Sequence, residues 1–128
     1  DAYEQLGELY LKMNRFDNAE QALRKALQLN PKMPASLFGL AKINMQREKY
    51  QQALNEIDSA LRLAPGSQTV HFVRGRILLK LGRREEAEKE LLISKNMLDA
   101  AAAKESIEPS SMDDTRIRNP ELSGSAPQ

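Results

Sequence analysis

The 128-residue sequence contains no cysteine, no tryptophan and only one histidine, and its aromatic content is low at 5%. Without cysteine, disulfides, thiolate metal sites and a cysteine nucleophile are excluded. A lone histidine gives little support to a transition-metal site. The sequence also lacks a glycine-rich phosphate loop, a nucleophile elbow and a convincing pair of catalytic carboxylates. It therefore predicts neither an enzyme nor a site for a metal or cofactor.

No run of apolar residues approaches the length of a membrane span. The net charge is only +1, and the segment from Glu105 onward carries five acids and two bases, so the first 104 residues carry +4. A charge this small is far from the profile of a nucleic-acid-binding protein. We therefore expect neither a nucleic acid nor a membrane as partner, and the sequence predicts no particular compartment.

A repeating pattern, with a period of about 34 residues, runs through most of the chain and fades near Asp99. Similar residues recur at this spacing in three columns: Ala19, Ala53 and Ala87; Leu23, Ile57 and Leu91; Gly7, Ala41 and Gly75. Each copy contains two stretches with apolar residues at helical spacing, and Pro31 and Pro65 end the first two copies. A fixed period of this length is typical of a solenoid, whose units bury their apolar faces against one another. The small residues allow helix axes to approach closely.

The stop signals predict six helices, paired into three repeats at about 1–33, 34–67 and 68–101. The predicted helices are residues 2–13, 18–29, 35–46, 51–63, about 69–81 and about 85–104. Asp17 is the expected N-cap of the second helix. The last helix lacks a proline at the expected stop, and alanines at 100–103 favour an extension to about Lys104. Residues 105–128 are poor in apolar side chains, so we expect a disordered tail.

The recurring positions resemble the tetratricopeptide repeat (TPR). The matching residues of the first copy are Tyr3, Leu6, Gly7, Tyr10, Ala19, Leu23, Ala26 and Pro31. Those of the second copy are Leu37, Leu40, Ala41, Asn44, Ala53, Ile57, Ala60 and Pro65. The third copy, which departs from the pattern towards its end, has His71, Arg74, Gly75, Leu78, Ala87, Leu91, Ser94 and Asp99. The resemblance implies an all-α solenoid, a right-handed superhelix of three antiparallel helix pairs, and a packing role for His71.

The resemblance also implies a concave groove, lined by the first helix of each pair, that binds a peptide or partner protein. Carried over by register, the groove-facing residues are Asp1, Glu4, Glu8, Leu11 and Lys12; Ala35, Phe38, Lys42, Met45 and Gln46; and Thr69, Phe72, Arg76, Leu79 and Lys80. The nine expected to choose a partner are Glu4, Glu8, Phe38, Lys42, Met45, Phe72, Arg76, Leu79 and Lys80.

Two features of this predicted groove have alternative interpretations. Phe38 and Phe72 suit an apolar anchor of a partner, or they pack against each other or an adjoining helix. Acids in the first repeat and bases further on would steer an apolar and acidic ligand, or they form a solvated mixed-charge surface. Family members that clamp the acidic C-terminus of heat-shock chaperones use Lys, Asn and Arg. The matching positions here are Glu4, Glu8, Gly39, Thr69 and Val73, so we expect no such clamp.

The leading hypothesis is a non-enzymatic interaction module that binds a protein or peptide. The alternative is a structural cap or spacer at the C-terminal end of a longer array. The chain begins with Asp1, in register with the repeat, and we expect it to be a fragment of a longer protein. Exposed solenoid ends can self-associate, so a dimer is a further expectation. The segment at 112–114, an apolar residue followed by two acids, is a candidate for masking the groove.

Overall fold

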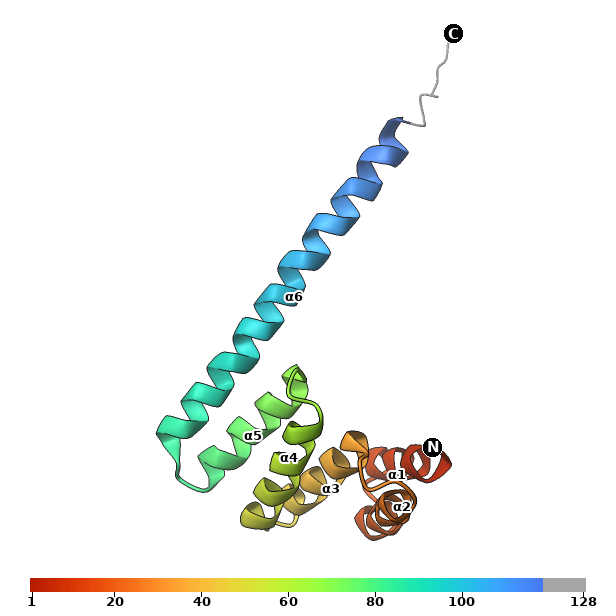
Figure 1. Cartoon of the computed structure of the whole chain (residues 1–128), viewed down its shortest axis with the longest axis vertical. Helices are drawn as coiled ribbons and strands as arrows, with labels where there is room; N and C mark the ends of the chain where they lie inside the picture. Colours follow the sequence, from red (N-terminus) through yellow and green to blue (C-terminus); the bar gives the residue numbers. More distant parts are fainter. Residues whose placement is uncertain (119–128) are drawn as a thin grey trace. The chain divides into compact units, whose positions relative to one another are not determined.

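The fold is that of a computed structural model, which describes residues 1–118 and, among them, the side chains of residues 1–105. This part of the chain contains helices and no strand (Figure 1). The helices are α1 (Ala2–Lys12), α2 (Phe16–Leu29), α3 (Pro34–Gln46), α4 (Tyr50–Leu63), α5 (Gln68–Lys80) and α6 (Arg84–Arg118). None of the helices in the described part is both long and apolar enough to cross a membrane.

The described residues fall into two units. The first, Asp1–Ser94, holds α1 to α5 and the start of α6, and it contains the three predicted helix pairs. The predicted all-α solenoid is therefore confirmed. In the second unit, which begins at Lys95, α6 continues to Arg118, and the ammonium of Lys95 lies 2.8 Å from a carboxylate oxygen of Asp99 one turn later.

Within each pair, the two helices are joined by a turn that uses a left-handed residue at the same place in the repeat. Asn14, Glu48 and Gly82, which occupy equivalent positions of the three repeats, have φ angles of 59°, 61° and 79°. In all three turns the amide of the following residue donates to the carbonyl five residues earlier, at 2.8–2.9 Å. This is the hydrogen bond of a Schellman-type helix end, which needs a left-handed residue. Only the third turn has the glycine that fits it without steric cost.

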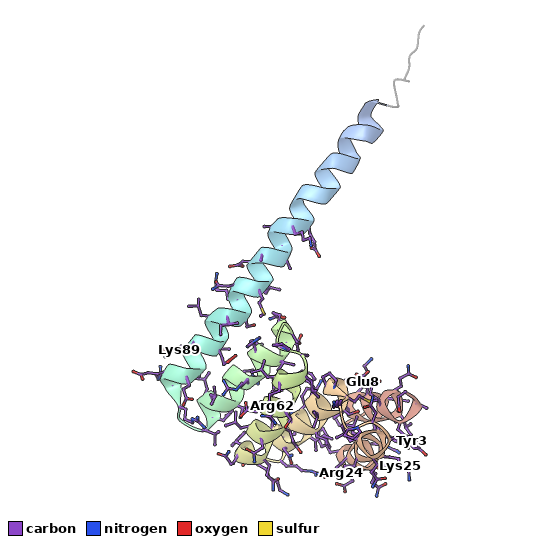
Figure 2. The ribbon with its side chains drawn as sticks, in the orientation of Figure 1. Tyr3, Glu8, Arg24, Lys25, Arg62 and Lys89 are labelled. Carbon is purple, nitrogen blue, oxygen red and sulfur yellow. The ribbon has the colours of Figure 1, made fainter. Side chains whose placement is uncertain are left out.

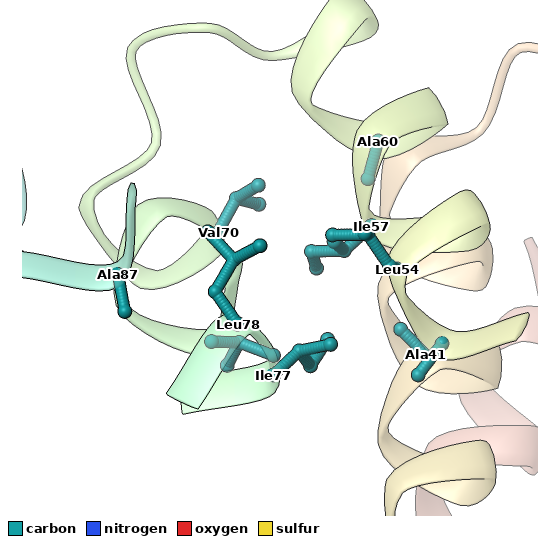
Figure 3. Close-up of a cluster of buried hydrophobic side chains, with 10 residues drawn as sticks. Ala41, Leu54, Ile57, Ala60, Val70, Ile77, Leu78 and Ala87 are labelled. Carbon is teal, nitrogen blue, oxygen red and sulfur yellow. The ribbon is translucent and has the colours of Figure 1, made fainter. Parts of the chain in front are cut away.

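The core is built from the recurring small and apolar residues. Figure 3 shows its largest cluster, in which side chains of α5 meet those of α3 and α4. A methyl group added at Gly7 would lie 2.5 Å from a methyl carbon of Leu23, and one added at Gly75 would lie 2.6 Å from Leu91. These two glycines therefore allow the helices of a pair to approach closely, as the repeat pattern predicted.

Each second helix covers the first helix of the next pair, so the same positions are buried in some repeats and exposed in others. Leu40 and Ile43 of α3 are 2% and 1% exposed because α2 packs on them. Their equivalents in α1, Leu6 and Leu9, are 39% and 53% exposed, and nearby Met13 is 51% exposed. We name Leu6, Leu9 and Met13 the outer face of α1.

Two predicted boundaries are wrong. α2 begins at Phe16, after Arg15, and no side chain caps it, so Asp17 is not its N-cap. α6 passes the predicted end near Lys104 and runs to Arg118. No glycine occurs between Gly82 and Gly124 to end the helix, although α6 includes Pro109, a residue type that usually interrupts one. Residues 119–128 and the side chains of the proposed masking segment 112–114 lie outside the described residues, so the masking hypothesis stays a prediction.

Candidate partner-binding groove

A groove of about 510 Å³ opens along the first helices of the three pairs. Its lining residues are Glu8, Leu11, Lys12, Asn14, Phe16, Ala35, Phe38, Gly39, Lys42, Met45, Gln46, Val73 and Arg76. The volume falls in the usual range for a small-molecule site, roughly 300–1,000 Å³, and is enough for a few side chains of a partner. In Figure 2, Glu8 projects from the upper edge of the first helix pair and Lys25 of α2 from the lower edge.

The structure brings five of the nine predicted partner-choosing residues together in this groove. They are Glu8, Phe38, Lys42, Met45 and Arg76. The other four, Glu4, Phe72, Leu79 and Lys80, are not among its lining residues. Four lining residues were not predicted: Asn14, Phe16, Gly39 and Val73. They belong to the first interhelical turn, to α2 and to buried positions of α3 and α5, which a register of outward-facing residues does not include.

Two cations of the groove lie over aromatic rings. The ammonium of Lys42 is 5.1 Å from the centre of the Phe38 ring, and the guanidinium carbon of Arg76 is 5.9 Å from that of Phe72. Each pair joins residues one turn apart on one helix, and the two pairs occupy equivalent positions of successive repeats. Such a contact contributes about 0.5–1 kcal/mol at an exposed site and favours one position of a long, mobile side chain.

The two phenylalanines differ in burial. Phe72 is 42% exposed on α5, whereas Phe38 is half-buried and packs against the core cluster. Phe38 is therefore placed for both alternatives, packing and partner binding. Its side chain packs against the core cluster and also lines the groove. Phe72 remains available to a partner beside the groove.

The first repeat carries acids where the other two carry these aromatic–cation pairs. Glu4 is equivalent to Phe38, and Glu8 is equivalent to Lys42. Burial raises the pKa of Glu4, and the neighbouring Glu8 carboxyl raises it further by hydrogen bonding and by charge repulsion. The acid of the groove lining, Glu8, lies at this end together with Lys12, while Lys42 and Arg76 lie at the middle and far end.

A buried polar network holds α5, the third helix along the groove, against its neighbours. The guanidinium of Arg74 lies 2.6 Å from Asp58 of α4 and 2.9 Å from Glu90 of α6. His71 is 7% exposed, and its Nδ1 and Nε2 atoms lie 2.5 Å from Glu90 and 2.9 Å from the carbonyl of Pro65. The burial of His71 agrees with its predicted packing role, but its hydrogen bonds were not predicted.

A second set of ion pairs joins α3 to α2. Arg47 pairs with Asp17 and, at 2.6 Å, with Glu20, which also lies 2.8 Å from Arg24. Arg47, and then Arg24, lower the pKa of Glu20 by hydrogen bonding and by charge. Arg47 stands where the first repeat has Met13 and the third has Leu81. A charged residue at this otherwise apolar position is the sequence signal that could have indicated the contact.

The described residues contain no cluster of three or more His, Asp or Glu side chains that could hold a metal ion. The groove itself presents apolar side chains, three cations and one acid.

Comparison with known proteins agrees with the repeat pattern and the helix pairs. A family model described as tetratricopeptide repeat matches residues 4–68, and a second model of the same description matches residues 44–105. The chain belongs to the tetratricopeptide repeat family. Among curated proteins, this TPR chain is 29% identical over 91 residues to anaphase-promoting complex subunit 3 of Schizosaccharomyces pombe. The match covers 71% of this chain but only 14% of that protein.

Solved structures share the fold of this TPR chain. MamA has a TM-score of 0.70 at 23% identity, over 77% of this chain and 58% of that one. The second TPR of Spaghetti (RPAP3), bound to the HSP90 peptide SRMEEVD, has a TM-score of 0.72 at 16% identity, over 75% of this chain and 89% of that one. At these identities the likeness shows the fold alone.

Proposed function

We propose that this TPR domain is a non-enzymatic interaction module that binds a peptide or partner protein along α1, α3 and α5. The observation that carries the proposal is the groove of about 510 Å³, in which Phe38, Lys42 and Arg76 lie together. Two relatives support the class of function. One is named as a subunit of a protein complex, and the other holds a bound peptide.

The chemistry of the groove favours a protein over a nucleic acid or a membrane as partner. Leu11, Met45 and Val73 offer an apolar floor for an anchor side chain, and Phe72 adds an exposed ring beside it. The charged residues of the lining are three cations, Lys12, Lys42 and Arg76, and one acid, Glu8. A phosphate backbone would need a continuous basic track instead.

We do not expect this chain to bind the peptide that the RPAP3 domain holds. The sequence of that peptide, SRMEEVD, ends in two glutamates, a valine and an aspartate. Here the positions that the resemblance assigns to a carboxylate clamp hold Glu4, Glu8, Gly39, Thr69 and Val73. The carboxylate of Glu8 in the groove and that of Glu4 near it repel a third, so we expect no measurable affinity for that peptide.

Selection from a displayed library of random peptides tests the proposal. We expect enriched peptides to lose about tenfold or more in affinity on the Phe38→Ala/Phe72→Ala variant, because buried aromatic anchors dominate such interfaces. Because Phe38 also packs against the core, the double variant could lose affinity through a change in folding. The single Phe72→Ala variant removes only an exposed ring, so its loss of affinity reports on peptide binding itself. No enrichment, or binding by both variants that equals that of the unaltered protein, would contradict the proposal.

The matched control is Leu29→Ala/Leu63→Ala. These leucines also occupy equivalent positions of two repeats and are 64% and 40% exposed, but they lie at the ends of α2 and α4, outside the groove lining. Binding by this variant should equal that of the unaltered protein.

A second candidate function is that of the C-terminal cap or spacer of a longer array. The outer face of α1 favours it, because the equivalent side chains of α3 lie under a preceding helix. At the other end, Glu88 of α6 is exposed where α4 has the buried Leu54, so α6 is less suited to receive a further repeat. Further copies of the repeat upstream of Asp1 in the complete gene would support this function, and their absence would contradict it. Without such copies, the outer face is also a candidate for self-association.

A further inference from the structure

One charged position recurs in all three repeats and faces the same groove each time. Glu8, Lys42 and Arg76 occupy equivalent positions of the three repeats, and all three line the groove. Their charges along it are negative, positive and positive. We name these residues the charge column.

The spacing of the column suits a particular peptide conformation. α1 packs on α3, and Phe38 of α3 packs on the cluster that contains Val70 and Val73 of α5. Packed helix axes lie roughly 8–10 Å apart, as for α1 and α3, and the equivalence of the repeats implies a similar step from α3 to α5. A polyproline II helix advances about 3.1 Å per residue with three residues per turn, so every third side chain points the same way after about 9 Å. A peptide in this conformation therefore presents one side chain to each repeat.

We infer that the groove selects an extended peptide by its charge order: a basic residue opposite Glu8, and acidic residues opposite Lys42 and Arg76, with two residues between successive positions. This inference rests on the proposed function. The peptide pattern is basic–x–x–acidic–x–x–acidic, in one chain direction or the other. Intervening apolar residues meet Met45 and the ring of Phe38.

Two features make the column suited to recognition rather than to solvation alone. The rings of Phe38 and Phe72 lie under Lys42 and Arg76, which favours a defined position of both cations before a ligand arrives. Near Glu8, the carboxyl of Glu4 adds a second acid outside the groove lining, where Lys12 is the neighbouring cation of the lining, and the pKa of Glu4 is raised by burial and by Glu8. A basic side chain placed there relieves the repulsion between the two carboxyls.

Two synthetic peptides distinguish charge order from charge content. One has the matched order basic–x–x–acidic–x–x–acidic. The other exchanges the first two charges to give acidic–x–x–basic–x–x–acidic, which has the same composition and the same charge order in both chain directions. An exposed ion pair changes an affinity by up to about fivefold, and a like-charge contact opposes binding by a similar factor. We expect the unaltered protein to bind the matched peptide about tenfold more tightly.

The matched variant is Glu8→Lys/Lys42→Glu, which exchanges the same two charges on the protein and leaves its net charge at +1. Both side chains are exposed, so the fold should be kept. We expect the preference to reverse, with the exchanged peptide now binding more tightly. The control Glu88→Lys/Lys89→Glu makes the same exchange on exposed residues of α6 outside the groove, and it should keep the original preference.

The outcomes separate this inference from the function on which it rests. Equal affinities for the two peptides, both lost on Phe72→Ala, would overturn the charge-order inference and leave the proposed groove intact. Equal affinities that survive both Phe72→Ala and Phe38→Ala/Phe72→Ala would overturn both. A preference that fails to reverse on Glu8→Lys/Lys42→Glu would also overturn the inference. Library peptides selected on the unaltered protein should share the matched order, and selection without it would contradict the inference.

Discussion

The Nδ1 atom of His71 lies 2.5 Å from the Oε1 atom of Glu90, and both side chains are buried between α5 and the start of α6. The other carboxylate oxygen of Glu90 lies 2.9 Å from the guanidinium of Arg74. One carboxylate therefore contacts two side chains of the preceding helix. These contacts hold α5, the helix that brings Arg76 into the groove.

Replacing Glu90 with alanine leaves the Nδ1 atom of His71 without its partner and leaves Arg74 with Asp58 alone. Because removing one partner of a buried pair leaves an uncompensated polar group, we expect a loss of about 2–4 kcal/mol in the free energy of unfolding. Chemical denaturation followed by circular dichroism measures it. The control is Glu88→Ala, whose side chain is 65% exposed and should change stability by less than about 0.5 kcal/mol. Equal effects of the two substitutions would show that the network contributes nothing.

In the interhelical turns, substitutions at equivalent positions should change the free energy of unfolding in opposite directions. Glu48 has φ of 61° and Gly82 has φ of 79°, a region that costs a residue with a side chain about 1 kcal/mol. We expect Glu48→Gly to raise the free energy of unfolding by up to about 1 kcal/mol and Gly82→Ala to lower it by a similar amount. Thermal and urea unfolding would measure both.

Gly66→Ala is the control for these turn variants. Gly66 does not have a positive φ, and no atom lies within 4 Å of a methyl group added there. This substitution should be neutral or slightly stabilising, because alanine restricts the unfolded chain. A loss at Gly66 as large as that at Gly82 would mean that left-handed strain is not the cause.

Glu56 and Glu20 should respond to pH in opposite directions. Burial raises the pKa of Glu56, although Asn44 donates a hydrogen bond to it at 2.6 Å, so its ionised form is disfavoured in the folded state. Its contribution to stability is present below the ordinary glutamate pKa of about 4.3 and is lost as pH rises through the raised value. Glu56→Gln should therefore be more stable than the unaltered protein at neutral pH, by less than about 1 kcal/mol, since the group is only partly buried.

Glu20→Gln serves as the opposite case. Arg47 and Arg24 lower the pKa of Glu20, so its contribution is present above the ordinary value and is lost as pH falls through the lowered one. This variant should be less stable at neutral pH and should approach the unaltered protein in acid. Melting temperatures measured across the acidic and neutral range test both, and a shift of the same sign for both variants would contradict this assignment.

The repeat register predicted the helix pairs and the buried columns, such as Ala53 and Ile57, which are both 0% exposed. It did not predict how polar residues pair. Arg74 stands where the first two repeats have Leu6 and Leu40, and only the folded structure shows that it meets Glu90. A period tells which positions share a face, but the distance between two long polar side chains depends on how their helices pack.

The groove was predictable to the same extent. Glu8, Lys42 and Arg76 follow from the register, and they lie in one groove. The register did not predict how much of the Phe38 side chain is buried. The residue stands at an outward-facing position, but its ring also packs against the core cluster.

The last prediction concerns the outer face of α1. It compares Leu9 with the residue at the same position of α3, Ile43, because the two differ most in exposure. Leu9 is 53% exposed, whereas Ile43, at the same position in α3, is 1% exposed beneath α2. Leu9→Ala removes little buried surface and should cost less than about 1 kcal/mol in the free energy of unfolding, whereas Ile43→Ala leaves a cavity and should cost about 2–5 kcal/mol.

Urea unfolding of the isolated chain at low protein concentration measures both costs. If Leu9→Ala costs as much as Ile43→Ala under these conditions, the outer face of α1 is already covered. A cost for Leu9→Ala that appears only as the protein concentration rises would identify a second copy as the cover. A large cost that appears only when another repeat precedes Asp1 would identify that repeat's second helix as the natural cover of this face.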